Sequence, residues 1–181
     1  MTLPNIITLA RLFLVPVIVY FLVIGNYDLS FYLFVIAGIS DAVDGFIAKT
    51  FNSVSALGEI LDPIADKVLL VALFVTLGIQ AHLPAWIVIL VASRDVMIAG
   101  AVVISPLLGV EASTRPLFLS KINTTLQIIL TSVVLGTLAF ELDMMGTVTV
   151  LSILVAVFTI LSGGQYLMRW LGLAADLEEE T

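Results

Sequence analysis

Four aspartates gather in one short polar stretch of an otherwise apolar sequence. Asp41 and Asp44 are three residues apart, and Asp62 and Asp66 are four residues apart. Residues at either spacing share one face of a helix, so each pair is expected to project from one side. A short polar segment separates the pairs. This pattern predicts two antiparallel helices that bring all four carboxylates to one point.

Four carboxylates in a partly dry site repel one another and need a compact cation to balance their charge. Lys49 and Lys67 are too few and too mobile to neutralise the set. Oxygen ligands suit Mg²⁺ and Mn²⁺, and such ions usually bring phosphate with them. Gly45, Ala48 and Gly58 let a bulky ligand approach the helix backbone. The stretch therefore predicts a metal-dependent diphosphate site, although any one of these acids alone fits a helix cap or an arginine partner equally well.

The rest of the sequence describes an all-α integral membrane protein. Of its 181 residues, 61% are hydrophobic and 12% are charged, and the mean hydropathy is +1.20. A soluble domain is near half apolar and a quarter charged. A spanning helix takes about 20 residues, so about six transmembrane helices fill the chain. We expect a single six-helix domain over residues 1–172 and an acidic tail over residues 173–181.

Apolar runs and the turn residues between them define the expected elements. A short N-terminal interfacial segment ends at Arg11, with Pro4-Asn5 as a helix-start signal, and the short first span either tilts or extends back into this segment. The six predicted helices cover residues 12–24, 29–48, 58–81, 85–104, 120–140 and 144–171. The longer predicted loops are residues 49–57 and 105–119.

All seven lysines and arginines fall on or toward one side of this arrangement, together with the aspartates. The positive-inside rule makes that side cytoplasmic. The first residues lack a basic segment and a cleavage site, so we expect no leader peptide and a bacterial inner membrane location. The chain has no cysteine, which excludes disulfides, and no nucleic-acid partner is expected.

The acidic stretch resembles the signature of the CDP-alcohol phosphatidyltransferase family, D-x2-D-G-x2-A-R-x8-G-x3-D-x3-D. With every gap of the family's length, the fixed positions are Asp41, Asp44, Gly45, Ala48, Lys49, Gly58, Asp62 and Asp66. The departure is Lys49, where the family has arginine; lysine keeps the charge but loses the bidentate fork. The resemblance implies six transmembrane helices, a homodimer and a site that faces the cytoplasm.

The resemblance also implies a reaction in which an alcohol hydroxyl displaces CMP from a CDP-linked lipid, usually CDP-diacylglycerol. Two Mg²⁺ or Mn²⁺ ions would take part. The implied metal ligands are Asp41, Asp44, Asp62 and Asp66. Asp66 is also the candidate base for the attacking hydroxyl. The residues implied to line the cytidine diphosphate are Asp44, Gly45, Ala48, Lys49 and Gly58.

Other segments resemble one branch of the family, the CMP-forming cardiolipin synthases, which use phosphatidylglycerol as acceptor. These segments are PNIITLARLFLVP, SALGEILDPIADK, ASRDVMIAG and RPLFLSKINTTLQ. The related phosphatidylglycerophosphate synthases use glycerol 3-phosphate and tend to have Arg-Glu in the fourth helix and Gly-Lys-x-Lys-Thr in the fifth. This chain has Arg94-Asp95 and Ser120-Lys121-Ile122-Asn123-Thr124 instead. The pattern favours phosphatidylglycerol and leaves glycerol 3-phosphate as the alternative.

Both candidate acceptors carry a phosphate, and the cations expected to hold it are Arg94, Arg115 and Lys121. Arg115 and Lys121 fit equally well as anchors on the positive side of the membrane. Arg94 lies deeper in an apolar run, where an unpaired charge is costly. Asp95 should face about 100° away from it, so the two need not neutralise each other.

Other polar residues have less specific expectations. Asn123 and Gln127 either extend a polar face into the site or join helices by hydrogen bonds. Arg11 and Arg169 are expected to be interfacial anchors, and His82 a hydrated turn residue.

An ion-coupled transporter is the competing class, because carboxylates inside a membrane also mark ion pathways. Here the acids cluster at one side of the membrane, away from its midplane, and no inverted repeat of them is present. Both features disfavour transport.

Overall fold

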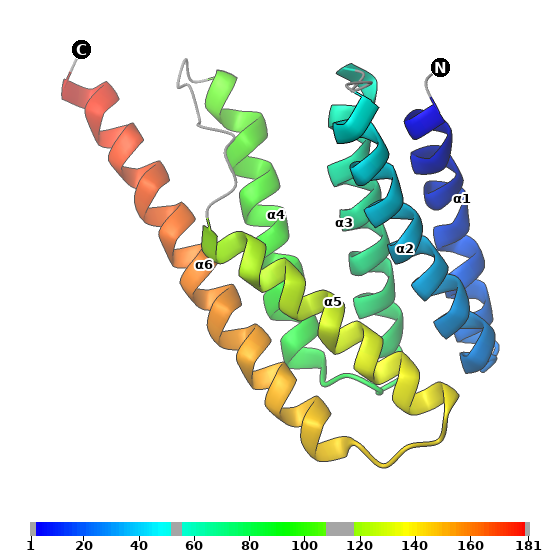
Figure 1. Ribbon diagram of the computed structural model, residues 1–181. Helices are drawn as coiled ribbons and strands as arrows, with labels where there is room; N and C mark the ends of the chain where they lie inside the picture. Colours follow the sequence, from blue (N-terminus) through cyan, green and yellow to red (C-terminus); the bar gives the residue numbers. More distant parts are fainter. Residues whose placement is uncertain (1–2, 52–55, 108–117, 180–181) are drawn as a thin grey trace. The chain divides into compact units, whose positions relative to one another are not determined.

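The structure is a computed structural model that describes residues 3–51, 56–107 and 118–179 (Figure 1). Within these ranges, side chains are described except at residues 3–6, 42, 44–51, 56–63, 102–107, 171 and 173–179. The described residues form six helices and no strand, which confirms the predicted all-helical class. The helices are α1 (Leu3–Val23), α2 (Tyr27–Phe51), α3 (Ala56–Ile79), α4 (Ala85–Leu107), α5 (Phe118–Ala139) and α6 (Met145–Glu179).

The first helix includes the N-terminal residues because nothing in the sequence ends it before the apolar run. α1 begins at Leu3 and continues through Arg11 without interruption. Pro4 is tolerated in the first turn, where backbone amides have no intrahelical partner. The first helix thus extends back through the expected interfacial segment, which is one of the two forms expected for this span.

The connection between the two aspartate-bearing helices is shorter than predicted. α2 runs to Phe51 and α3 starts at Ala56, whereas the sequence predicts loop over residues 49–57. Residues 49–51 and 56–57 contain no proline or glycine that would end a helix. At the other end of the chain, α6 continues to Glu179, so the helix extends into the acidic tail.

The chain divides into two compact units, of which the first contains residues 1–83 and 131–145. In this unit α1 packs against both α2 and α3. Its most deeply buried apolar side chains include Ile18, Leu22, Leu73, Phe74 and Leu77. Gln80 Nε2 also donates a hydrogen bond to the Leu22 carbonyl at 3.0 Å. These contacts fix α1 against the two helices that carry the aspartates.

The second unit contains residues 84–130 and 146–181. Ile87, Leu130 and Val155 are fully buried in it. Its buried polar side chains include Arg94, Asn123, Gln127, Ser152, Thr159 and Ser162. α4 and α6 approach closely at Gly163, where an added Cβ would lie 3.5 Å from Met97 Cε and 3.6 Å from Arg94 Cγ. This unit therefore encloses polar groups within an apolar setting.

Two segments of the described residues are long and apolar enough to cross a membrane by themselves, Phe118–Ala139 and Met145–Trp170. A shorter apolar helix covers Ile7–Val23. Large apolar side chains are exposed on all six helices, among them Phe13, Ile36, Ile79, Ile89, Phe118 and Ile160. Lipid contact accounts for an apolar exterior of this kind. Six helices are thus confirmed, and two of them meet the requirements of a membrane span.

Candidate active site

Two of the four predicted aspartates meet at a single guanidinium nitrogen. Arg11 Nη1 lies 2.5 Å from Asp41 Oδ1 and 2.5 Å from Asp66 Oδ1. The three residues come from α1, α2 and α3 of the first unit. The Arg11 side chain is 1% exposed, whereas each aspartate side chain is 43% exposed. The cation is therefore enclosed while both carboxylates remain accessible.

Helix packing explains why these residues converge. Asp41 lies in the second half of α2 and Asp66 in the first half of α3, on either side of the short connection. Because α1 packs against both helices, Arg11 can reach both carboxylates. The backbone is helical through residues 41–44 and 62–66, so each predicted aspartate pair has the helical spacing assumed for it.

Arg11 is not the interfacial anchor expected from the sequence. It is 3% exposed and forms ion pairs with two carboxylates. A buried cation without a partner is costly, and pairing offsets part of that cost. The signal in the sequence is that Arg11 is the only charged residue of α1. A lone charge in an apolar helix needs partners from other helices, and the aspartates were the available acids.

The remaining signature residues are placed by their backbone alone. On α2 these are Asp44, Gly45, Ala48 and Lys49, and on α3 they are Gly58 and Asp62. Their side chains lie outside the described set, and Arg115 lies outside the described residues altogether. Among the side chains that are described, no group of three or more His, Cys, Asp or Glu could hold a metal ion. Since two of the four predicted ligands are not in that set, the metal site stays a prediction.

The described part of the acidic site fits a hard divalent cation. It presents carboxylate oxygens, the ligand type that Mg²⁺ and Mn²⁺ prefer. One oxygen of Asp41 and one of Asp66 lie 2.5 Å from the same atom, so the two can act on one positive centre together. The oxygen ligands and their convergence both suit a divalent cation at this point.

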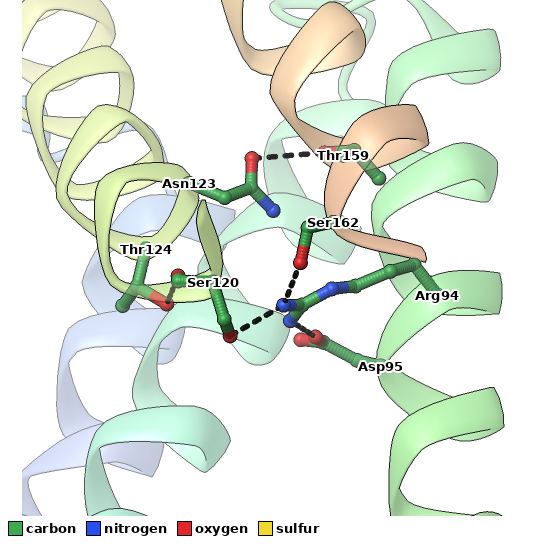
Figure 2. A network of polar contacts seen from close by, with 7 residues as sticks. All are labelled: Arg94, Asp95, Ser120, Asn123, Thr124, Thr159 and Ser162. Carbon is green, nitrogen blue, oxygen red and sulfur yellow. Dashed lines mark hydrogen bonds and ion pairs between the residues drawn. The ribbon is translucent and has the colours of Figure 1, made fainter. Parts of the chain in front are cut away.

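Arg94 is the centre of a polar network in the second unit (Figure 2). Its Nη1 pairs with Asp95 Oδ1 at 2.6 Å. Its Nη2 donates hydrogen bonds to Ser120 Oγ at 2.6 Å and to Ser162 Oγ at 2.7 Å. The Arg94 and Asp95 side chains are only 4% and 11% exposed. The network thus ties α4 to α5 and α6 inside the unit.

The pairing of Arg94 with Asp95 corrects an expectation drawn from helical geometry. Adjacent residues on a helix point about 100° apart, which was taken to separate their charges. The arginine side chain is long enough to bend back to its neighbour, so the two charges neutralise each other. Arg94 therefore has carboxylate and hydroxyl partners within its own unit.

Asn123 joins α5 to α6 near the arginine (Figure 2). Thr159 Oγ1 donates a hydrogen bond to Asn123 Oδ1 at 3.0 Å, and both side chains are buried. This contact confirms for Asn123 the expectation that polar residues of α5 join helices. By contrast, Lys121 is exposed. The assignment of an acceptor phosphate to Arg94, Arg115 and Lys121 stays a prediction.

Comparison with known proteins gives a consistent family. The model of the CDP-alcohol phosphatidyltransferase family matches residues 1–173. The CMP-forming cardiolipin synthase of Homo sapiens is 34% identical over 157 residues, which cover 77% of this chain and 52% of that protein. The probable CMP-forming cardiolipin synthase of Drosophila melanogaster is 36% identical over 152 residues, covering 75% and 47%. The chain thus spans about half the length of these two relatives.

A bacterial relative with the other acceptor matches over nearly its whole length. The CDP-diacylglycerol–glycerol-3-phosphate 3-phosphatidyltransferase of Bacillus subtilis (strain 168) is 34% identical over 183 residues, which cover 92% of this chain and 94% of that protein. These relatives differ in the reactions for which they are named. With the family model matching residues 1–173, the chain belongs to the CDP-alcohol phosphatidyltransferases, a membrane-associated family of phospholipid-synthesising transferases.

Proposed function

We propose that the chain transfers a phosphatidyl group from CDP-diacylglycerol to a hydroxyl of phosphatidylglycerol, giving cardiolipin and CMP. The observation that carries the proposal is the meeting of Asp41 and Asp66 at one point of the first unit. Asp41 is the first and Asp66 the last fixed position of the acidic signature of the family. Their convergence supports a single site built from α2 and α3.

The signature residues would divide the work of this reaction. Asp41, Asp44 and Asp62 would hold Mg²⁺ or Mn²⁺, with Asp66 as a further ligand. Two bound ions would neutralise the diphosphate and the leaving CMP. Asp66 would accept the proton of the attacking hydroxyl. The oxygen of that hydroxyl would bond to the phosphatidyl phosphorus as the bond from this phosphorus to CMP breaks.

The cytidine diphosphate would lie along the small residues of the two helices. The residues assigned to it are Asp44, Gly45, Ala48, Lys49 and Gly58. Small side chains allow the diphosphate to approach the backbone, and Lys49 would supply a positive charge.

The preference for phosphatidylglycerol is supported by the network around Arg94. Asp95, Ser120 and Asn123, at which the chain departs from the glycerol 3-phosphate pattern, all belong to this network. The phosphate of phosphatidylglycerol is a diester with one negative charge, whereas a phosphate monoester carries about −1.5 to −2 at neutral pH. Arg94 would bind the acceptor phosphate with Arg115 and Lys121. Because Asn123 stands where the glycerol 3-phosphate pattern has a second lysine, this site has one positive charge fewer, and the monoanion is the better match.

Phosphatidylglycerophosphate synthesis from glycerol 3-phosphate is the second candidate. The Bacillus subtilis relative supports it, because the match covers 94% of that protein. The relatives described above give no support to an ion-coupled transporter.

The proposed enzyme is a homodimer in a bacterial inner membrane, with its active site facing the cytoplasm. The support for this orientation is the distribution of lysine and arginine along the sequence. CDP-diacylglycerol and CMP would then enter and leave on the side where nucleotides are available.

A product assay on the purified chain tests the proposal. The reaction contains CDP-diacylglycerol, Mg²⁺ or Mn²⁺, and either phosphatidylglycerol or glycerol 3-phosphate, and both CMP and lipid products are measured. We expect cardiolipin with phosphatidylglycerol and no lipid product with glycerol 3-phosphate. Phosphatidylglycerophosphate formed from glycerol 3-phosphate would select the second candidate. Asp41→Asn is the control for contaminating activity. If no CMP is released with either acceptor, both candidate functions are refuted.

A further inference from the structure

Arg11 has an arrangement that a simple anchor of α1 does not need. One of its nitrogens contacts two carboxylates from two different helices, each at 2.5 Å. The other two guanidinium nitrogens, Nε and Nη2, are buried and make no hydrogen bond to a described residue. Among the described contacts, the charge of Arg11 is therefore balanced at the single point where Asp41 and Asp66 meet.

The metal ligands proposed above include both of these aspartates. A cation that bridged the same oxygens of Asp41 and Asp66 would lie within contact distance of both, as Arg11 Nη1 does. Two positive centres cannot occupy the same space, and two cations that share the same oxygens also repel each other. A divalent cation that took the position of Nη1 between these two oxygens would therefore have to displace it.

We propose that Arg11 is a positioning residue that holds Asp41 and Asp66 together and competes with the divalent cation for them. The inference rests on the proposed function, because it takes these aspartates as metal ligands. Binding of the metal displaces Nη1 from at least one carboxylate. Arg11 thereby lowers the affinity of the site for divalent cations and keeps the two carboxylates close when such cations are scarce.

A purely structural role for Arg11 makes a different prediction. If Arg11 only fastens α1 to α2 and α3, its removal destabilises the fold equally with and without metal and leaves metal affinity unchanged or weaker. If it competes, its removal strengthens metal binding. By linkage, a ligand that binds one state more tightly stabilises that state more. Metal would then raise the melting temperature of the variant more than that of the wild type.

The test is Mn²⁺ binding by the full chain in detergent, measured by calorimetry and by the electron paramagnetic resonance of free Mn²⁺. We expect Arg11→Met to lower the dissociation constant about tenfold, within the usual range of coupling between two binding events. The Mn²⁺-dependent rise in melting temperature should also be larger than in the wild type. Arg11→Lys, which keeps the charge, should stay near the wild-type affinity.

Matched controls separate the site from a general charge effect. Arg169→Met removes the same charge from an exposed position of α6 and should leave Mn²⁺ affinity unchanged. Asp41→Asn should weaken binding and thereby assign the measured ion to this site. If Arg11→Met does not fold, Arg11→Gln takes its place, because its amide can still donate to one carboxylate without a charge.

The outcomes distinguish this inference from the proposed function. Equal or weaker Mn²⁺ binding by the uncharged variants would overturn the competition while leaving the transferase intact. Mn²⁺ binding that tightens in Arg11→Met, in a chain that forms neither lipid product, would uphold the competition and refute the proposed function. A wild type that binds no Mn²⁺ and releases CMP without it would overturn the metal site and this inference together.

Discussion

Replacing Arg94 by methionine should sharply lower the stability of the second unit. The substitution keeps a long, flexible side chain against Gly163, so the loss is mainly polar. It removes the 2.6 Å ion pair to Asp95 and the hydrogen bonds to Ser120 and Ser162. Asp95, whose side chain is 11% exposed, would lose the guanidinium group that pairs with it at 2.6 Å in an enclosed setting.

The expected loss follows from that geometry. Removing one partner of a buried ion pair costs about 3 to 5 kcal/mol. For a chain of this size each kcal/mol shifts the melting temperature by about 2 to 4 °C, so a fall of about 6 to 20 °C is expected. The matched substitution Arg169→Met, at an exposed position of α6, should cost less than about 0.5 kcal/mol.

Thermal unfolding in detergent, followed by circular dichroism, measures both variants. Ser162→Ala tests the network separately, because it removes one hydrogen bond to a charged group worth about 1.5 to 3 kcal/mol. In the Arg94→Met background, where that bond no longer exists, Ser162→Ala should cost under about 0.5 kcal/mol. A fall below about 3 °C for Arg94→Met, or equal costs of Ser162→Ala in both backgrounds, would refute this role of Arg94.

Four further outcomes are expected. Asp41→Asn should reduce CMP release more than about a hundredfold and leave a folded protein, because asparagine still offers Arg11 an oxygen; near-normal turnover would contradict the metal assignment. Lys49→Arg should retain activity, since it restores the family's residue, and complete loss in the product assay would mean a different diphosphate pocket. Ala81→Gly should raise the melting temperature by about 1 to 4 °C, because Ala81 has φ 59° and glycine adopts this conformation without steric cost; Ala99→Gly, at an exposed position inside α4, should do the reverse. Burial lowers the pKa of His82 below its usual 6.5, so the unfolded chain takes up a proton first and stability should fall as pH drops through 6.5; an equal slope in His82→Gln would contradict this.

The helices could be predicted well because their apolar runs have the length of a span and turn residues lie between them. Their ends could not, since residues such as Thr50 and Phe51 neither favour nor forbid another helical turn. α2 therefore extends beyond the predicted boundary at Ala48.

The spacing of residues along the sequence predicts the aspartates of the candidate site, but it does not predict which cation they meet. Spacing along the chain places Asp62 and Asp66 on one helical face, since that relation is local. Arg11 is 55 residues away from Asp66, and only the packing of α1 against α3 brings them together. A pattern of spacings within one helix carries no information about such a contact.

The pairing of Arg94 with Asp95 was missed although the two residues are adjacent in the sequence. Helical geometry correctly predicts that the Cα–Cβ bonds of Arg94 and Asp95 point in different directions. The four rotatable bonds of arginine then let the guanidinium group turn back and pair with Asp95. Flexible charged side chains are placed by the partners that surround them, and the angle of the Cα–Cβ bond decides much less.

The ion pairs of Arg11 also set an order of events during synthesis of the chain. At about 5 to 20 residues per second, Asp66 follows Arg11 by about 3 to 11 s. During that interval the first helix carries a positive charge that its final partners cannot yet neutralise, so it is held near the membrane surface where water or lipid phosphates solvate it. Docking of α1 then waits for α2 and α3. Asp41 and Asp66 would thus first allow α1 to pack against α2 and α3 during synthesis, and would take part in the reaction only afterwards.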